Sequence, residues 1–123
     1  MSENRTPDVF TFEQEGKTIE LVMYAGLLNK VLSTIGGVDN MDELLIKPDI
    51  QNEVLRLVLT EYDDDGNEVG KKAKAFKLTT LQQSDLVSWV MGHCADFFVR
   101  ISDKMTPLKT EMTQKISGLS KVG

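Results

Sequence analysis

The stretch that most constrains the fold is residues 80–105, because its pattern predicts one long helix that other elements must cover. At about 3.6 residues per turn, its large apolar residues share one face. Thr80 and Gln83 fit a capping box at its start, and the Thr106-Pro107 step favours a stop. We therefore predict a core helix. Its apolar face comprises Leu86, Val87, Val90, Met91, Cys94, Phe97, Phe98, Ile101 and Met105.

Residues 9–22 predict a β-hairpin. Apolar and polar residues alternate on both sides of Glu15-Gly16, and glycine tolerates the positive φ that a type I′ turn requires. An isolated two-stranded ribbon is marginal in water, so its apolar face must dock on the rest of the chain. The pairs expected across the ladder are Phe12 with Ile19 and Phe10 with Leu21.

A second amphipathic helix is predicted directly after the hairpin. Its apolar residues recur at the spacing of one helical face, and Gly36-Gly37 supplies a C-terminal cap. Asp39 and Asn40 are candidate caps for a short helical turn that Pro48 interrupts. The apolar residues of the longer helix are Tyr24, Leu27, Leu28, Val31, Leu32 and Ile35.

Residues 50–62 allow two interpretations. After Asp49 as a cap, apolar residues at helical spacing favour a helix to about Thr60. Alternating leucines with Asp65-Gly66 just beyond fit a β-hairpin instead. We favour the helix, followed by a solvated acidic and lysine-rich connection and a short extended piece at residues 75–78.

With 123 residues the chain suffices for one core without disulfide or metal support. We expect a flexible N-terminus at residues 1–8, a single globular domain at residues 9–105, and a short C-terminal helix or mobile tail at residues 106–123. The predicted fold class is α+β and mostly helical, with an N-terminal β-hairpin packed on three to four helices.

The formal net charge of −5 argues against a nucleic-acid partner, which would require clustered Lys and Arg. A single cysteine excludes an internal disulfide and suits a reducing cytoplasm. The first residues lack the apolar run of a signal peptide, and the sequence has no stretch of eighteen apolar residues. We therefore expect no membrane partner.

Two patterns resemble sites of chemistry, and neither is complete. Aligning Gly66 with the glycine of a calcium loop places Lys72 where a bidentate glutamate is required, so a hydrated turn is favoured. His93 and Cys94 are adjacent on a helix and point about 100° apart, which is unsuitable for a base and its thiol. We expect a non-enzymatic protein with no catalytic residue, metal or cofactor.

Interaction surfaces are the remaining class of site. Trp89 lies toward the polar side of its helix, where it either packs beneath the hairpin or the acidic loop or anchors a protein contact. A narrow apolar stripe follows Pro107 and either folds back on its own domain or docks on another chain. The stripe consists of Leu108, Met112, Ile116 and Leu119.

The order of these elements resembles the tail assembly chaperone family of long-tailed phages. The parts that carry the resemblance are FTFEQEGKTIEL, the helix YAGLLNKVLSTIG, the middle helices around Pro48 and the helix SDLVSWVMGHCADFFVRI, within residues 9–105. It implies a non-enzymatic late protein that binds the tape measure protein and helps recruit tail tube subunits. It also implies a place in the host cell cytoplasm and absence from the mature virion, and the family commonly makes a longer frameshifted form.

Two functions follow as hypotheses. The first is a self-associating tail assembly chaperone, for which six methionines would supply adaptable apolar contacts. The alternative is a structural or adaptor subunit retained in the phage particle.

Overall fold

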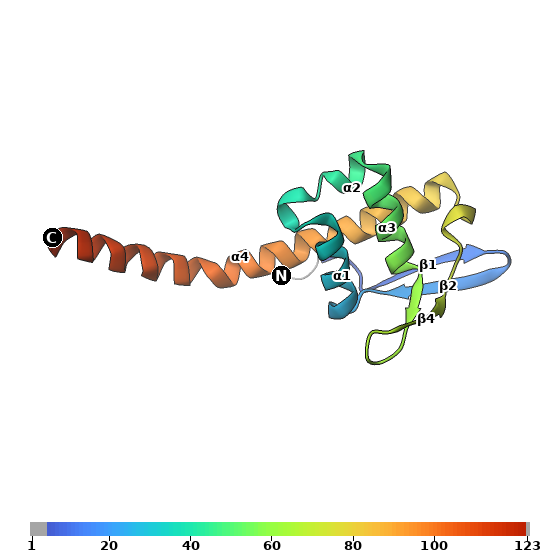
Figure 1. Ribbon diagram of the computed structural model, residues 1–123, viewed down its shortest axis with the longest axis horizontal. Coiled ribbons are helices and arrows are strands. Elements are labelled where there is room, and N and C mark those ends of the chain that lie inside the picture. Colours follow the sequence, from blue (N-terminus) through green and yellow to red (C-terminus); the bar gives the residue numbers. More distant parts are fainter. Residues whose placement is uncertain (1–4, 123) are drawn as a thin grey trace.

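In the computed structural model, the backbone is described for residues 5–122 and the side chains for residues 5–104. Over this part the chain is α+β and mostly helical, with an N-terminal hairpin and four α-helices, which confirms the predicted fold class. The elements in chain order are β1 (Val9–Gln14), β2 (Lys17–Val22), α1 (Ala25–Ile35), the 3₁₀ turn η1 (Val38–Asn40), α2 (Glu43–Ile46), α3 (Pro48–Val58), β3 (Thr60–Tyr62), β4 (Glu68–Lys71), the 3₁₀ turn η2 (Ala75–Lys77) and α4 (Thr80–Val122) (Figure 1).

The N-terminal hairpin has the predicted register. Phe12 pairs with Ile19 and Phe10 pairs with Leu21. The turn residues Glu15 and Gly16 have φ values of 52° and 77°, so both adopt the positive φ of a type I′ turn.

Helix α1 ends as predicted, at a left-handed glycine. Gly36 has φ 97°, and its N–H and that of Gly37 both donate to the carbonyl of Leu32. The prediction that Asn40 caps the next helix is wrong. The Nδ2 of Asn40 instead donates to the carbonyl of Gly36, at the end of α1, and the side chain of Asp39 caps no helix.

Helix α3 begins at Pro48, so the prediction that Asp49 caps it is wrong. A proline suits the first helical position because its φ is already helical and its missing N–H has no partner to lose. Each of the two interpretations of residues 50–62 is correct for one part of this segment. The helix ends at Val58, and β3 then pairs with β4 across the acidic turn in a second hairpin.

Two smaller predictions nearby are wrong. The extended piece expected at residues 75–78 is the 3₁₀ turn η2. The capping box of α4 lies one residue earlier than predicted. The N–H of Gln82 donates to Thr79 Oγ1 at 3.1 Å, and the N–H of Thr79 donates to Gln82 Oε1 at 3.0 Å.

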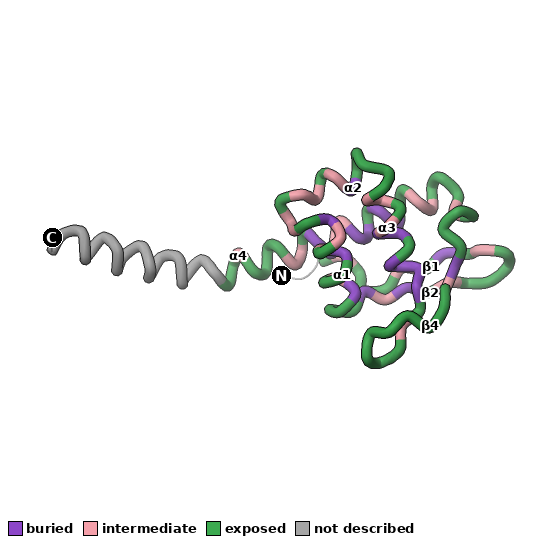
Figure 2. Tube along the Cα trace, viewed as in Figure 1, coloured by how far each residue is buried: buried purple, intermediate pink, exposed green. Residues whose placement is uncertain are grey.

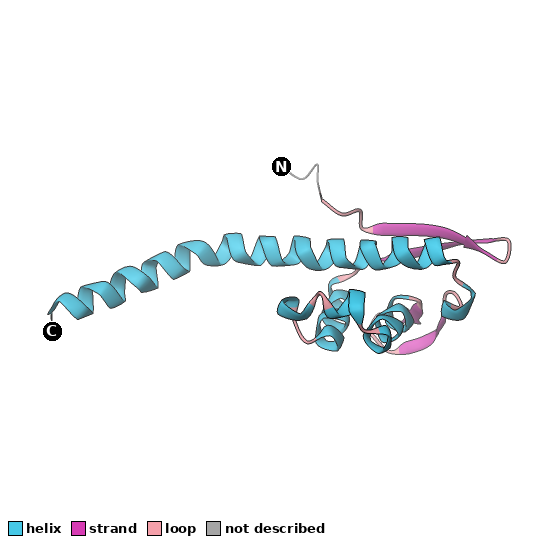
Figure 3. Ribbon diagram, turned by 90° about the horizontal axis from the view of Figure 1, so that it is seen from above, coloured by secondary structure: helices cyan, strands magenta, loops and turns pink. Residues whose placement is uncertain are grey.

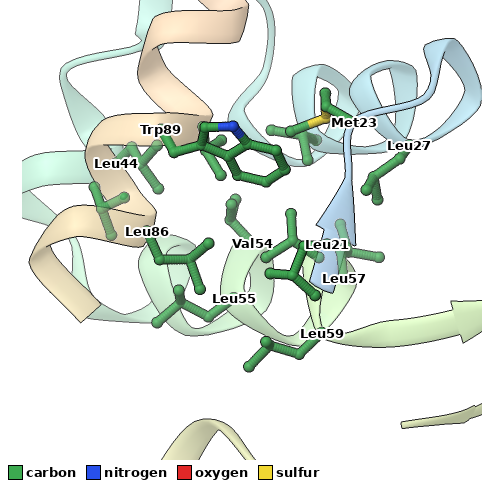
Figure 4. Close-up of a cluster of buried hydrophobic side chains, with 14 of the residues drawn as sticks. Leu21, Met23, Leu27, Leu44, Val54, Leu55, Leu57, Leu59, Leu86 and Trp89 are labelled. Carbon is green, nitrogen blue, oxygen red and sulfur yellow. The ribbon is translucent and has the colours of Figure 1, made fainter. Parts of the chain in front are cut away.

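Helix α4 is the central element of the packing. Its first half lies between the β1–β2 hairpin and a layer formed by α1, η1, α2 and α3 (Figure 3). Leu86 and Trp89 face the same cluster of side chains as Leu21 of β2 and Val54 of α3 (Figure 4). The most deeply buried residues are Leu21, Val31, Leu44, Val54, Val58, Leu86, Val90 and Cys94.

The predicted helix stop at Thr106-Pro107 is wrong, because α4 continues to Val122. A proline inside a helix removes one backbone hydrogen bond and crowds the preceding turn, at a cost of about 3 kcal/mol. It biases the chain against helix without forbidding it, and helix-favouring residues flank Pro107 on both sides. The C-terminal segment is therefore not a separate short helix.

Replacing Gly36 with Ala should lower the free energy of unfolding by about 1–2 kcal/mol, because a Cβ is strained at this positive φ. Replacing Gly26 with Ala is the matched control, since a Cβ there meets nothing within 4 Å and α1 would gain up to about 1 kcal/mol. Denaturant unfolding of both variants measures the difference. Equal effects of the two replacements would contradict the role of Gly36 as a cap.

Candidate protein-contact surface

The segment before β1 lies against α4 and covers one side of it. The carbonyl of Pro7 accepts hydrogen bonds from Trp89 Nε1 at 2.8 Å and from His93 Nε2 at 2.7 Å. The N–H of Thr6 donates to Asp96 Oδ2 at 2.7 Å, which holds the pKa of that carboxyl below its usual value. Residues 5–8 are therefore part of the packing, whereas residues 1–4 of the expected flexible N-terminus lie outside the described part.

Trp89 lies under the hairpin. Its side chain is only 6 % exposed, and its ring centroid lies 5.6 Å from that of Phe10. The indole N–H is also engaged by Pro7. Of the two alternatives for Trp89, the structure shows packing beneath the hairpin. Periodicity on a single helix does not reveal this, because the covering residues belong to the hairpin and the segment before it.

His93 and Cys94 are both buried, and their surroundings differ. His93 packs edge-on against Trp89 at 5.1 Å between ring centroids. Cys94 lies in the apolar core, where burial raises the pKa of its thiol to about 11. A thiol with so high a pKa is a poor nucleophile near neutral pH, and the imidazole is held by Pro7. This pair is an element of packing.

The acidic loop is a closed turn, as the sequence favours. Asp63 Oδ1 accepts the backbone N–H groups of Asp65 and Asn67, both at 2.9 Å, and these bonds lower the pKa of Asp63. Its carboxylate is thus used within the turn between β3 and β4. In the part of the chain with described side chains, no group of three or more His, Cys, Asp or Glu is arranged to hold a metal ion.

Two of the open hollows on the surface of the body lie beside the starts of α1 and α4, and a third, of about 330 Å³, lies beside η2. The larger of the first two, of about 590 Å³, lies between the start of α1 and the acidic turn, and in its lining Tyr62 donates to the carbonyl of Leu57 and Asp63 accepts within its own turn. The smaller, of about 310 Å³, lies between α2 and the start of α4. Exposed apolar side chains at Leu45 and Leu81 lie on these two helices. The second hollow therefore offers contact area without a convergent set of reactive groups.

Exposed apolar side chains also follow α4 out of the body. We call residues 95–122 the α4 arm. Phe98 is 49 % exposed and Ile101 is 43 % exposed, and the helix changes from buried to exposed where it leaves the other elements (Figure 2). The prediction that these two residues belong to the core is wrong, because no other described element reaches that far along α4. Phe97, in the same predicted set, is half-buried.

The four remaining partner-binding candidates lie further along the arm. Leu108, Met112, Ile116 and Leu119 belong to the helical backbone of α4, and their side chains lie outside the described part. The structure thus places them in the same helix as Phe98, Ile101 and Trp89, but on the arm, whereas Trp89 is buried under the hairpin earlier in that helix. The spacing of apolar residues identified the stripe, but nothing in the sequence indicated that the helix continues across Pro107.

Comparison with known proteins gives no relative. No protein family, no curated protein and no solved structure matches this chain. In the described part of the chain, no helix is both long and apolar enough to cross a membrane.

Cys94 should react slowly with a thiol reagent in the folded protein. A pKa of about 11 in place of 9.0 leaves about 100-fold less thiolate at about pH 8, and burial slows access further. Labelling with Ellman's reagent should therefore be at least about 100-fold slower in the native protein than in concentrated guanidinium chloride. Equal rates would show an accessible, reactive thiol and would favour an enzymatic role.

Proposed function

We propose that this protein is a phage tail assembly chaperone that binds the tape measure protein and helps recruit tail tube subunits. The protein would act in the host cell cytoplasm, through protein contacts alone, and would be absent from the mature virion. The family resemblance in the sequence suggests this role, and the observation that carries it is the exposed apolar surface of the α4 arm.

A chaperone for a long helical client needs apolar surface that is already presented in the unbound state. The arm offers Phe98 and Ile101 on one side of a helix that stands clear of the body. An amphipathic helix of a client can lay its apolar face along such a stripe, because both have the same spacing of side chains. Contact of this kind covers surface that would otherwise favour aggregation.

The acidic body supports the same role. Residues 1–94 contain nine basic and sixteen acidic residues, so a complex with an apolar client would retain a strongly charged, solvated part. The buried thiol of Cys94 and the engaged imidazole of His93 also favour a role in binding over one in catalysis.

Co-expression with the tape measure protein encoded in the same phage genome tests the proposal. Wild-type chain should keep the client soluble and co-purify with it. Replacing Phe98 with Asp should reduce the co-purified amount by about tenfold, the usual effect of losing an apolar contact worth 1–2 kcal/mol. Size and solubility of the complex are read by gel filtration.

Val99→Asp is the matched control, since Val99 is 55 % exposed and adjacent to Phe98. It should bind the client as wild type does. Equal loss in both variants would contradict an apolar contact at the stripe. Finding the protein in purified particles by mass spectrometry would contradict the chaperone role and favour the retained structural or adaptor subunit.

A further inference from the structure

The apolar residues of α4 follow a repeat of eleven residues. From Leu86 onward the spacing is four, four and three, and it recurs three times without interruption. Such a repeat has about 3.67 residues per turn, close to the helix itself, so its members stay on one nearly straight face. The residues are Leu86, Val90, Cys94, Phe97, Ile101, Met105, Leu108, Met112, Ile116 and Leu119.

The body covers only the first three members of this repeat. Leu86, Val90 and Cys94 each have no exposed surface, whereas Phe97 is half-buried and Ile101 is 43 % exposed. The face that packs inside the body therefore continues onto the arm with nothing described against it. Because α4 is one continuous helix, the arm does not fold back onto its own body.

We infer that the arm pairs with the arm of a second copy of this chain, side by side and in opposite directions. A second copy has the same eleven-residue period, so the two apolar faces match over their whole length. The pairing is argued from the chain alone. Because it covers the stripe that carries the proposed function, a client would have to displace the second arm in order to bind there.

The contact is large enough for a specific dimer. The arm has 28 residues, about 42 Å of helix, and its sequence carries seven members of the repeat. At roughly 100 Å² for each of the ten members from Met105 onward in two chains, and about half that for Phe97 and Ile101, which are already partly covered, the pairing removes on the order of 1,200 Å² from water. Specific dimers commonly bury about 1,200–2,000 Å² in total.

The distribution of charge favours the opposite direction of the two helices. Residues 1–94 carry nine basic and sixteen acidic residues, whereas the arm carries five basic and three acidic ones. A parallel pair would bring two acidic bodies together at one end. An antiparallel pair instead sets the basic end of each arm, with Lys115 and Lys121, beside the partner's body.

The part of the body nearest to that end is acidic. The turn η1 contacts α4 and carries Asp39, Asp42 directly precedes α2, and Glu43 begins α2 and pairs with Lys47 at 3.1 Å. In the register that matches the repeat, Ile101 of one chain lies across from residue 116 of the other, and Met105 lies across from residue 112. Leu108 then lies close to the two-fold axis.

Light scattering of the purified wild-type chain should give twice the mass of 13.8 kDa. Ile101→Asp should be a monomer of 13.8 kDa with an unchanged circular dichroism spectrum. Ile101 is 43 % exposed in the single chain, so the substitution disturbs the pairing and not the fold. Val99→Asp is the control, two residues away and about 200° around the helix, and it should keep the double mass. A wild-type chain of single mass, or loss of the dimer in both variants, would overturn the pairing.

Cysteine cross-linking tests the direction. Oxidising a mixture of Ile101→Cys chains and Ile116→Cys chains should link the two variants to each other. Neither variant alone should form a linked dimer. An Ile101→Cys chain that links to itself would overturn the antiparallel arrangement.

The two proposals fail in different ways. A monomeric chain that binds the tape measure protein through Phe98 would overturn the pairing and leave the proposed function in place. A dimer that does not bind the tape measure protein would support the pairing and overturn the proposed function.

Discussion

The structure depends on the burial of one face of α4 between two layers that do not otherwise form a stable unit. The β1–β2 hairpin is a two-stranded ribbon, and α1 and α3 are helices of eleven residues each. Ribbons and helices of this size are marginal alone in water. Leu86, Val90 and Cys94 are fully buried where the layers meet. Stability of the body therefore rests on contacts far apart in the sequence.

The segment before β1 completes the other side of the same helix. A Cβ at Gly92 would overlap Thr6 Oγ1, so the absence of a side chain at that position permits the close approach. Pro7 contributes only its carbonyl, which two aromatic side chains share. These contacts hold the first described residues on the side of α4 that carries Gly92 and Asp96, and they leave the apolar stripe of the arm clear.

Local patterns predicted the elements whose causes are local. Alternation and Glu15-Gly16 determined the first hairpin and its register, and Gly36 determined the end of α1. The wrong predictions concern elements whose structure depends on contacts with residues far away in the sequence. The second hairpin was obscured by leucines that satisfy both periods, and its strands contain few apolar residues. The burial of Trp89 requires Phe10 and Pro7, which lie about eighty positions earlier.

Only part of the candidate surface was predicted from the sequence, again because local spacing does not show which residues other elements cover. Spacing alone placed Phe98 and Ile101 in the same apolar set as Leu86, and nothing in the pattern marks where the covering layers end. The residue before a proline is biased against helix, yet α4 continues through Thr106 and Pro107 to Val122. The point at which a helix extends beyond the elements that cover it depends on the arrangement of the whole fold, and the sequence of the helix alone does not show it.

Because the core and the arm belong to a single rod, the arm cannot turn about its own axis without also turning Leu86 and Val90 among their neighbours. Dense interiors resist such rotation. Whatever binds along the part of the arm before Pro107 is consequently held at a set angle and distance from the acidic body. Under the proposed function, successive subunits on the client would then be spaced and oriented by this part of the helix.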